Sequence, residues 1–100
     1  LMSPDSHVGR KTAAIVCEHV ARQRRPILSA FRTPPESPED SGWQFFCGKV
    51  KNEDPEGAQV WLLDEVLELE PSLEQYIDLA PGIQVWRSTP EGEWKVRRLE

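Results

Sequence analysis

The stretch PEDSGWQFFCGKV, residues 38–50, decides how the fold is read, because turn-forming residues run directly into an aromatic strand. Asp40 and Ser41 belong to the residue types whose side chains hydrogen-bond to nearby backbone groups, and Gly42 tolerates a positive φ. Residues 34–42, which contain three prolines, therefore predict a loop. We interpret the stretch as a turn that feeds a central strand, not as a catalytic loop.

The strand predicted at residues 43–50 carries apolar side chains on both faces. Side chains alternate along a strand, so Trp43, Phe45 and Cys47 share one face while Phe46 points to the other. A strand with apolar groups on both faces is typical of the middle of a sheet that is covered on both sides.

The chain before this strand predicts two more strands. Residues 12–20, TAAIVCEHV, are apolar and β-branched and predict a strand buried on both faces. Residues 27–33, ILSAFRT, predict the next strand, and the basic segment 21–26 is expected to form a loop or a short helical turn. The two strands are close enough in sequence to pair as neighbours. Residues 1–11 are polar and are expected to form a loose tail.

The chain after the aromatic strand predicts two short helices. Residues 58–70 begin like a strand and turn into a helix that Pro71 ends. Residues 71–79 predict a second short helix. The side chains expected to face inward from these helices are Leu63, Val66, Leu67, Leu73, Tyr76 and Ile77.

The C-terminal segment APGIQVWRSTPEGEWKVRR predicts a β-hairpin around a TPEG turn, with Gly92 in the left-handed conformation. That register places Trp86 opposite Val96 and leaves Arg87 beside Lys95 in solvent. Strands and helices are segregated along the whole chain. We therefore expect an α+β fold, with a mainly antiparallel sheet of about five strands, two short helices and a C-terminal β-hairpin.

The composition indicates one domain, which we assign to residues 12–98 of the 100-residue chain. The formal net charge of −5 argues against nucleic acid or a membrane surface as the partner. No apolar run approaches the roughly 20 residues of a membrane helix, and no secretory signal is visible, so a cytoplasmic location is expected. We read Leu99 and Glu100 as the remnant of an expression tag. The oligomeric state is not predicted.

Few residues of the chain suggest catalytic or metal chemistry. Cys17 and Cys47 lie in apolar segments and are expected to be reduced, buried thiols. With His7 and His19 they are the metal-ligating types, but the spacing of Cys17 and His19 fits the usual zinc motifs poorly. No nucleophile with a positioned base can be assigned. We therefore expect no metal, no cofactor and no enzymatic activity.

Two charged segments are candidate binding surfaces. Residues 64–78 contain no Lys or Arg, and their carboxylates either attract a basic partner or form only the solvated side of two helices. The candidate partner-binding residues are Asp64, Glu65, Glu68, Glu74 and Asp78. The alternative is a basic loop of Arg22, Arg24 and Arg25, which together with Trp43 predicts a regulatory domain that senses a small ligand or nucleotide.

The segment EDSGWQFFCG, residues 39–48, resembles the signature of a small bacterial family that is grouped with the immunity proteins of polymorphic toxin systems. The signature positions are Asp40, Ser41, Gly42, Trp43, Phe45, Phe46 and Gly48. The resemblance covers roughly residues 12–97, although family members often continue with acidic residues where this chain has Lys49, Val50 and Lys51.

The resemblance implies a non-enzymatic binding protein, an immunity-type inhibitor that occludes a cognate bacterial toxin. The expected contact surface combines the acidic segment with the loops 34–42 and 51–57, because recognition concentrates on loops held by a rigid scaffold.

Overall fold

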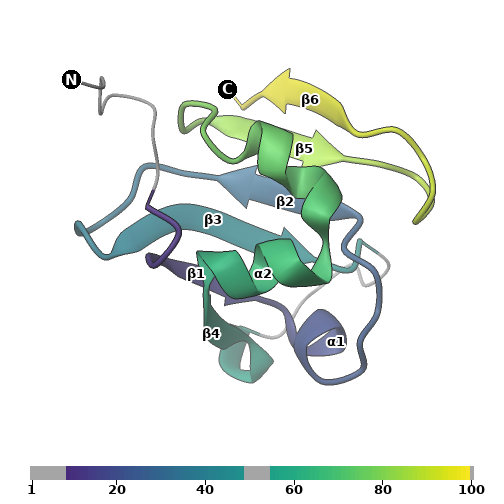
Figure 1. The fold of residues 1–100 in the computed structure, drawn as a ribbon, viewed down its shortest axis with the longest axis horizontal. Helices are drawn as coiled ribbons and strands as arrows, with labels where there is room; N and C mark the ends of the chain where they lie inside the picture. Colours follow the sequence, from purple (N-terminus) through teal and green to yellow (C-terminus); the bar gives the residue numbers. More distant parts are fainter. Residues whose placement is uncertain (1–8, 49–54, 100) are drawn as a thin grey trace.

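The computed structural model describes residues 9–48 and 55–99 of the chain. These residues form an α+β fold in which a six-stranded sheet, ordered β4-β1-β3-β2-β5-β6, carries short helices (Figure 1). The strands are β1 (Ala13–Val16), β2 (Ser29–Arg32), β3 (Asp40–Phe46), β4 (Gln59–Leu62), β5 (Ile83–Trp86) and β6 (Lys95–Arg98). The helices are α1 (Glu18–Ala21) and α2 (Leu63–Leu69), with 3₁₀ helices η1 (Pro55–Gly57) and η2 (Pro71–Tyr76).

The sheet is mixed but mostly antiparallel, as the segregation of strands and helices predicts. β1 and β3 pair in parallel, whereas every other neighbouring pair of strands is antiparallel. The sheet has one strand more than the expected five, and the C-terminal hairpin of β5 and β6 is confirmed. Among the described residues, no helix is long and apolar enough to cross a membrane.

The hydrophobic core lies between one face of the sheet and the helices α1, α2 and η2 (Figure 1). The alternation predicted for the aromatic strand is confirmed, because Trp43, Phe45 and Cys47 are buried on this face. The predicted change from strand to helix within residues 58–70 is also confirmed. The inward-facing helical residues Leu63, Val66, Leu67, Leu73 and Ile77 are buried, and Tyr76 is half-buried.

No described helix packs on the opposite face of the sheet, so the expectation that the aromatic strand is covered on both sides is wrong for the described residues. Phe46 lies on this face half-buried. Its ring meets that of Phe31 edge to face, with centroids 5.9 Å apart. Within the described part of the chain, the contact of Phe46 with Phe31 on the neighbouring strand shields the second face of β3, and no second layer of helices does so.

The first two strands do not pair as neighbours, because β3 lies between β1 and β2. The first strand is also shorter than expected: it ends at Val16, and His19 and Val20 belong to α1. The backbone N–H of Cys17 still donates to the carbonyl of Phe45, 2.9 Å away, which closes the strand. The chain then turns into α1, which leads to β2 on the far side of β3.

The hairpin is shifted by one residue from the predicted register. Trp86 lies opposite Lys95, not opposite Val96, which pairs with Val85. A shift of one residue exchanges the two faces of a strand, so Val85 enters the core. Arg87, expected in solvent, is buried instead. The TPEG turn is present, with the N–H of Gly92 donating to Thr89, but Gly92 does not adopt a positive φ.

Candidate functional site

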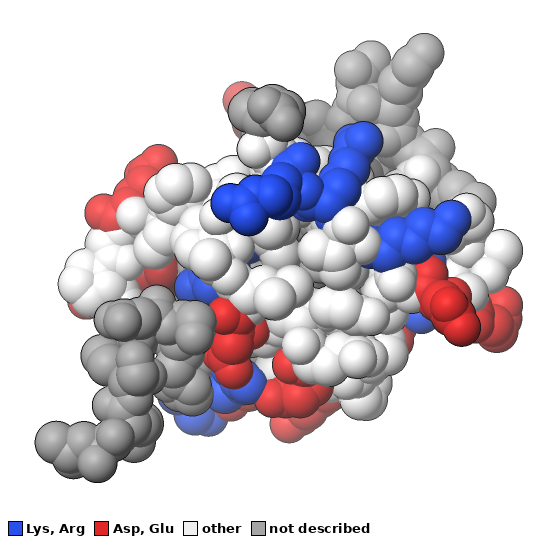
Figure 2. Space-filling view, turned by 90° about the horizontal axis from the view of Figure 1, so that it is seen from above, with Lys and Arg blue, Asp and Glu red and all other residues white. Residues whose placement is uncertain are grey.

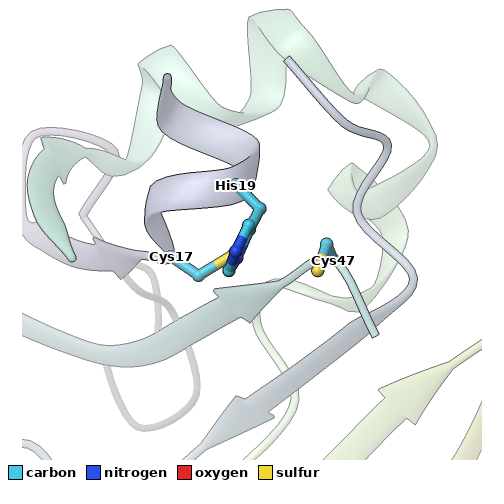
Figure 3. Close-up of side chains that lie close together, drawn as sticks. All are labelled: Cys17, His19 and Cys47. Atoms are coloured by element: carbon cyan, nitrogen blue, oxygen red, sulfur yellow. The ribbon is translucent and has the colours of Figure 1, made fainter. Parts of the chain in front are cut away.

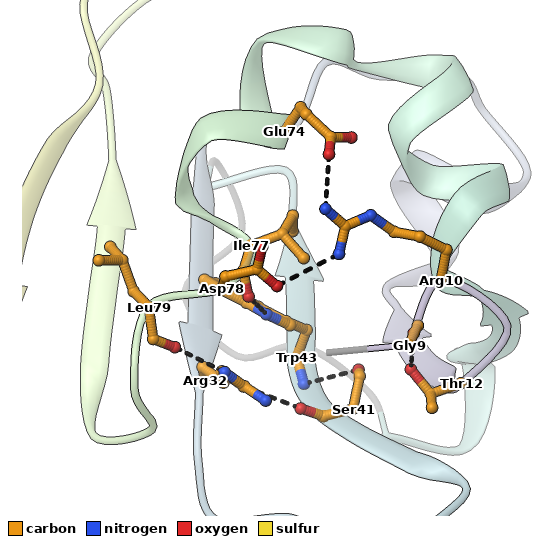
Figure 4. Close-up of polar contacts among 10 residues, drawn as sticks. All are labelled: Gly9, Arg10, Thr12, Arg32, Ser41, Trp43, Glu74, Ile77, Asp78 and Leu79. Carbon is orange, nitrogen blue, oxygen red and sulfur yellow. Dashed lines mark hydrogen bonds and ion pairs between the residues drawn. The ribbon is translucent and has the colours of Figure 1, made fainter. Parts of the chain in front are cut away.

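The start of β3 is held by its own side chains, as the residue types of Asp40 and Ser41 predict, but the bounds of the expected loop and strand are wrong: residues 40–42 belong to β3, which ends at Phe46. The Asp40 carboxylate accepts hydrogen bonds from the backbone N–H groups of Glu36 (3.0 Å) and Gly42 (2.9 Å). The Ser41 hydroxyl accepts from the N–H of Trp43 at 3.1 Å (Figure 4). Gly42 has a φ of +82°, which a residue with a side chain rarely adopts. These residues aim the Trp43 side chain into the core.

The other residues of this stretch also serve the fold. The indole Nε1 of Trp43 donates to the carbonyl of Ile77 at 3.0 Å, which ties β3 to the end of η2 (Figure 4). The rings of Trp43 and Phe45 stack with centroids 5.7 Å apart. Gly48 has a φ of +72°, and a Cβ there would lie 2.9 Å from the Leu28 Cβ. The structure therefore gives these positions folding roles.

The acidic segment forms an outer surface of α2 and η2, which we call the acidic surface. It consists of Asp64, Glu65, Glu68, Glu74 and Asp78. The inner sides of the same helices pack into the core, so the amphipathic pattern fixes the acidic residues outward. Glu65, Glu68 and Glu74 are exposed, whereas Asp64 and Asp78 are half-buried.

Two cations from the N-terminal segment bind to the acidic surface. Arg10 donates to Glu74 at 2.5 Å and to Asp78 at 3.3 Å (Figure 4), and Lys11 donates to Asp64 at 2.6 Å. Burial lowers the pKa of Arg10, but its hydrogen bonds to Glu74 and Asp78 outweigh this effect, so the pKa is raised. The hydrogen bond to Asp64 likewise raises the pKa of Lys11. The sequence predicts a loose tail over residues 1–11 and gives no sign of these ion pairs.

Within the acidic surface, Glu65 and Glu68 form no ion pair with another described residue. The Glu65 carboxylate accepts a hydrogen bond from the Leu62 N–H at 2.9 Å, which satisfies a donor at the start of α2. Five carboxylates thus face two cations on this surface, and the excess charge is negative.

The edge of the sheet at β6 has the opposite charge. Lys95, Arg97 and Arg98 are exposed along this strand. Figure 2 looks down on this edge and shows Lys and Arg side chains gathered over it, with acidic side chains around the rim. This net-acidic chain therefore also carries a basic edge at β6.

The structure does not bring the predicted arginine and tryptophan ligand site together. Arg22, Arg24 and Arg25 are exposed on the loop after α1, and Arg24 lies over the Trp61 ring at 5.9 Å. Trp43 is fully buried in the core. A hollow of about 430 Å³ lies between η2 and the β5–β6 connection, and another of about 380 Å³ lies beside the 34–42 loop. Neither hollow is lined by these arginines.

The structure does bring together Cys17, His19 and Cys47, whose ligand atoms all lie within 4.8 Å of one another (Figure 3). Cys17 and Cys47 are buried, and His19 is half-buried. All three are metal-ligating residue types in the sequence, but their meeting depends on the pairing of β1 with β3, which local sequence patterns do not predict.

The fold is that of a small α+β domain with a charged outer surface on its helices. Residues 14–98 match the family model described as the Immunity protein Imm33 domain, so the chain belongs to this family. Comparisons with curated proteins and with solved structures give no significant match. Family membership confirms the resemblance to immunity proteins and indicates a role in toxin immunity with a cognate toxin as partner.

Proposed function

We propose that this protein is a non-enzymatic inhibitor that binds a cognate toxin of basic surface charge and occludes the toxin's functional site. The observation that carries the proposal is the acidic surface on α2 and η2. Membership of an immunity family supplies the class of partner, a cognate toxin.

The acidic surface suits this role because its scaffold is rigid while its charges remain accessible. The helices that carry it are anchored by the fully buried side chains of Leu63, Val66, Leu73 and Ile77. A preorganised charged surface accelerates association with a partner of opposite charge and selects against partners of like charge. Arg10 and Lys11 neutralise only one part of it, which leaves Glu65 and Glu68 directed at the partner.

The 34–42 loop is proposed to extend the contact surface. Glu36 and Glu39 are exposed on it and add negative charge, while the Asp40 hydrogen bonds hold its end in place. The second loop expected from the sequence, residues 51–57, lies largely outside the described residues. In its described part, Glu56 is exposed.

The proposal is tested by affinity capture from a lysate of the source organism, with mass spectrometry of the captured proteins. The test variant is Glu68→Lys/Glu74→Lys, which reverses two exposed charges of the acidic surface. The matched control is Glu91→Lys/Glu93→Lys, which changes the net charge equally on the exposed β5–β6 connection. Circular dichroism establishes that all three proteins are folded.

We expect the wild type and the control to capture the same basic protein, and the test variant to lose it. Capture should also weaken as salt is raised, because screening reduces attraction between exposed charges. Equal capture by all three proteins would show that the acidic surface is only solvated and that the partner binds elsewhere on the domain.

A further inference from the structure

Cys17, His19 and Cys47 converge at one end of the sheet, away from the contacts of the acidic surface described above (Figure 3). Cys17 directly follows β1 and precedes α1, Cys47 directly follows β3, and His19 lies in α1. Because β1 and β3 are parallel neighbours, their carboxyl ends meet at the same edge of the sheet, and this brings the two thiols together.

The backbone around these three residues is fixed by hydrogen bonds. The N–H of Cys17 donates to Phe45 at 2.9 Å, and its carbonyl accepts from Ala21 at 2.9 Å, which closes the first turn of α1. The carbonyl of Phe46, next to Cys47, accepts from Leu28 at 3.0 Å. The donor atoms are therefore carried by ordered backbone, which is what a preformed metal site requires.

We propose that Cys17, His19 and Cys47 form a binding site for a thiophilic divalent cation, Zn²⁺. Two thiolates and one imidazole are ligand types that zinc prefers, and a set of three protein ligands leaves the fourth tetrahedral position to a water molecule. Two thiolates also balance the charge of Zn²⁺, so the occupied site is neutral. A neutral site suits the burial of both cysteines, which are 2% and 1% exposed.

The distances suit a site that closes on the ion. Zinc–sulfur bonds of about 2.3 Å in a tetrahedron place two sulfur atoms roughly 3.8 Å apart. The donor atoms here lie within 4.8 Å of one another. Small side-chain rotations are enough to close the remaining gap. His19 is half-buried, which gives the ion and its water a path from solvent.

The site is tested with Co²⁺ as a spectroscopic substitute for Zn²⁺, on the full chain in the presence of a phosphine reductant. Thiolate ligation produces charge-transfer absorption in the near ultraviolet, and tetrahedral coordination produces intense visible bands. We expect both to saturate at one equivalent of Co²⁺ and to disappear when one equivalent of Zn²⁺ is added.

The variants Cys47→Ala and His19→Ala identify the ligands, and His7→Ala is the matched control for a histidine elsewhere in the chain. Removing a direct ligand should weaken Co²⁺ binding by at least about 100-fold for Cys47→Ala and by at least tenfold for His19→Ala, since even outer partners of a metal site contribute 10–100-fold. His7→Ala should bind as tightly as the wild type. His19→Ala truncates a half-buried side chain, so it keeps the test valid if Cys47→Ala does not fold.

Two results would overturn the proposal. One is a wild-type protein that shows no charge-transfer absorption with Co²⁺. The other is a folded variant at Cys47 or His19 that binds Co²⁺ with wild-type affinity and spectrum. Neither result bears on toxin binding by the acidic surface, so each proposal is tested independently of the other.

Discussion

The two faces of the sheet are built from the same strands, but their surroundings differ. On one face, α1, α2 and η2 cover the strands, and fully buried side chains include Val16, Trp43, Phe45 and Val85. On the other face, no described helix packs, and large apolar side chains stay exposed: Ile15 at 37%, Val60 at 68% and Leu62 at 41%. We expect the covered face to determine stability, because burial of apolar surface dominates the free energy of folding.

The same division between an inner and an outer side applies to the helices, and it predicts that the acidic surface can be changed without loss of the fold. The helices contribute their inner sides to the core and their outer sides to the candidate contact. Substitutions on the outer sides should therefore change partner binding and leave the free energy of unfolding almost unchanged.

The sharpest test of the two faces uses neighbouring positions of β3. Trp43→Ala should lower the free energy of unfolding by about 3–5 kcal/mol, because it removes a fully buried ring and its hydrogen bond to Ile77. Gln44→Ala, on the open face, loses a hydrogen bond to Thr33 and should cost at most about 1 kcal/mol. Urea denaturation measures both values, and similar losses would contradict the assignment of the faces.

A pair of glycines tests the turn that positions β3. Both Gly42 and Gly82 have positive φ, but a Cβ on Gly42 would lie 2.1 Å from the Thr33 oxygen, while one on Gly82 would meet nothing within 4 Å. Gly82→Ala should therefore cost only the backbone strain, about 1 kcal/mol. Gly42→Ala should cost at least about 3 kcal/mol, since the strands must separate. Thermal unfolding measures the stability of both variants. A larger loss of stability for Gly82→Ala than for Gly42→Ala would contradict this prediction.

Two arginines of the C-terminal hairpin extend the comparison to charged groups. Arg87 is buried against the Ile27 carbonyl, the Trp94 ring and Glu70, to which it donates at 2.8 Å. Arg87→Met should destabilise the fold by about 2–4 kcal/mol, because it leaves the Glu70 carboxylate without its cation. Arg97→Met removes an exposed arginine and should cost less than about 1 kcal/mol. Equal costs in chemical denaturation would argue against the buried ion pair.

The smallest effect is expected from the pair of Lys11 and Asp64. The hydrogen bond to Asp64 raises the pKa of Lys11 above its usual 10.5. A pKa raised in the folded state means that this pair contributes stability below pH 10.5 and loses it as the pH rises through the folded-state pKa. Lys11→Met should remove this alkaline step and leave stability at lower pH slightly reduced. If Lys11→Met loses as much stability at alkaline pH as the wild type does, the loss belongs to another group.

Local patterns in the sequence predicted the parts of the fold that depend on neighbouring residues. Such patterns predict the hydrogen bond between Asp40 and Gly42, the alternation of Trp43 and Phe45, and the change from strand to helix before Leu63. Each reflects a local conformational preference or the periodicity of side chains.

Features that depend on distant contacts were not predictable in the same way. The place of β3 between β1 and β2 and the register of the hairpin depend on pairing across the whole sheet, to which local propensity is insensitive. The burial of Arg87 follows from that register. The acidic run was visible in the sequence, but the binding of Arg10 to Glu74 required the tertiary fold.

The central claim is that the acidic surface neutralises a basic toxin, and growth protection measures it most directly. The captured partner is expressed in a bacterial host together with the wild type, with Glu68→Lys/Glu74→Lys, or with Glu91→Lys/Glu93→Lys. The account predicts that the partner arrests growth, that the wild type and the control restore it, and that the variant of the acidic surface does not. Full protection by that variant, expressed at the same level, would contradict the account.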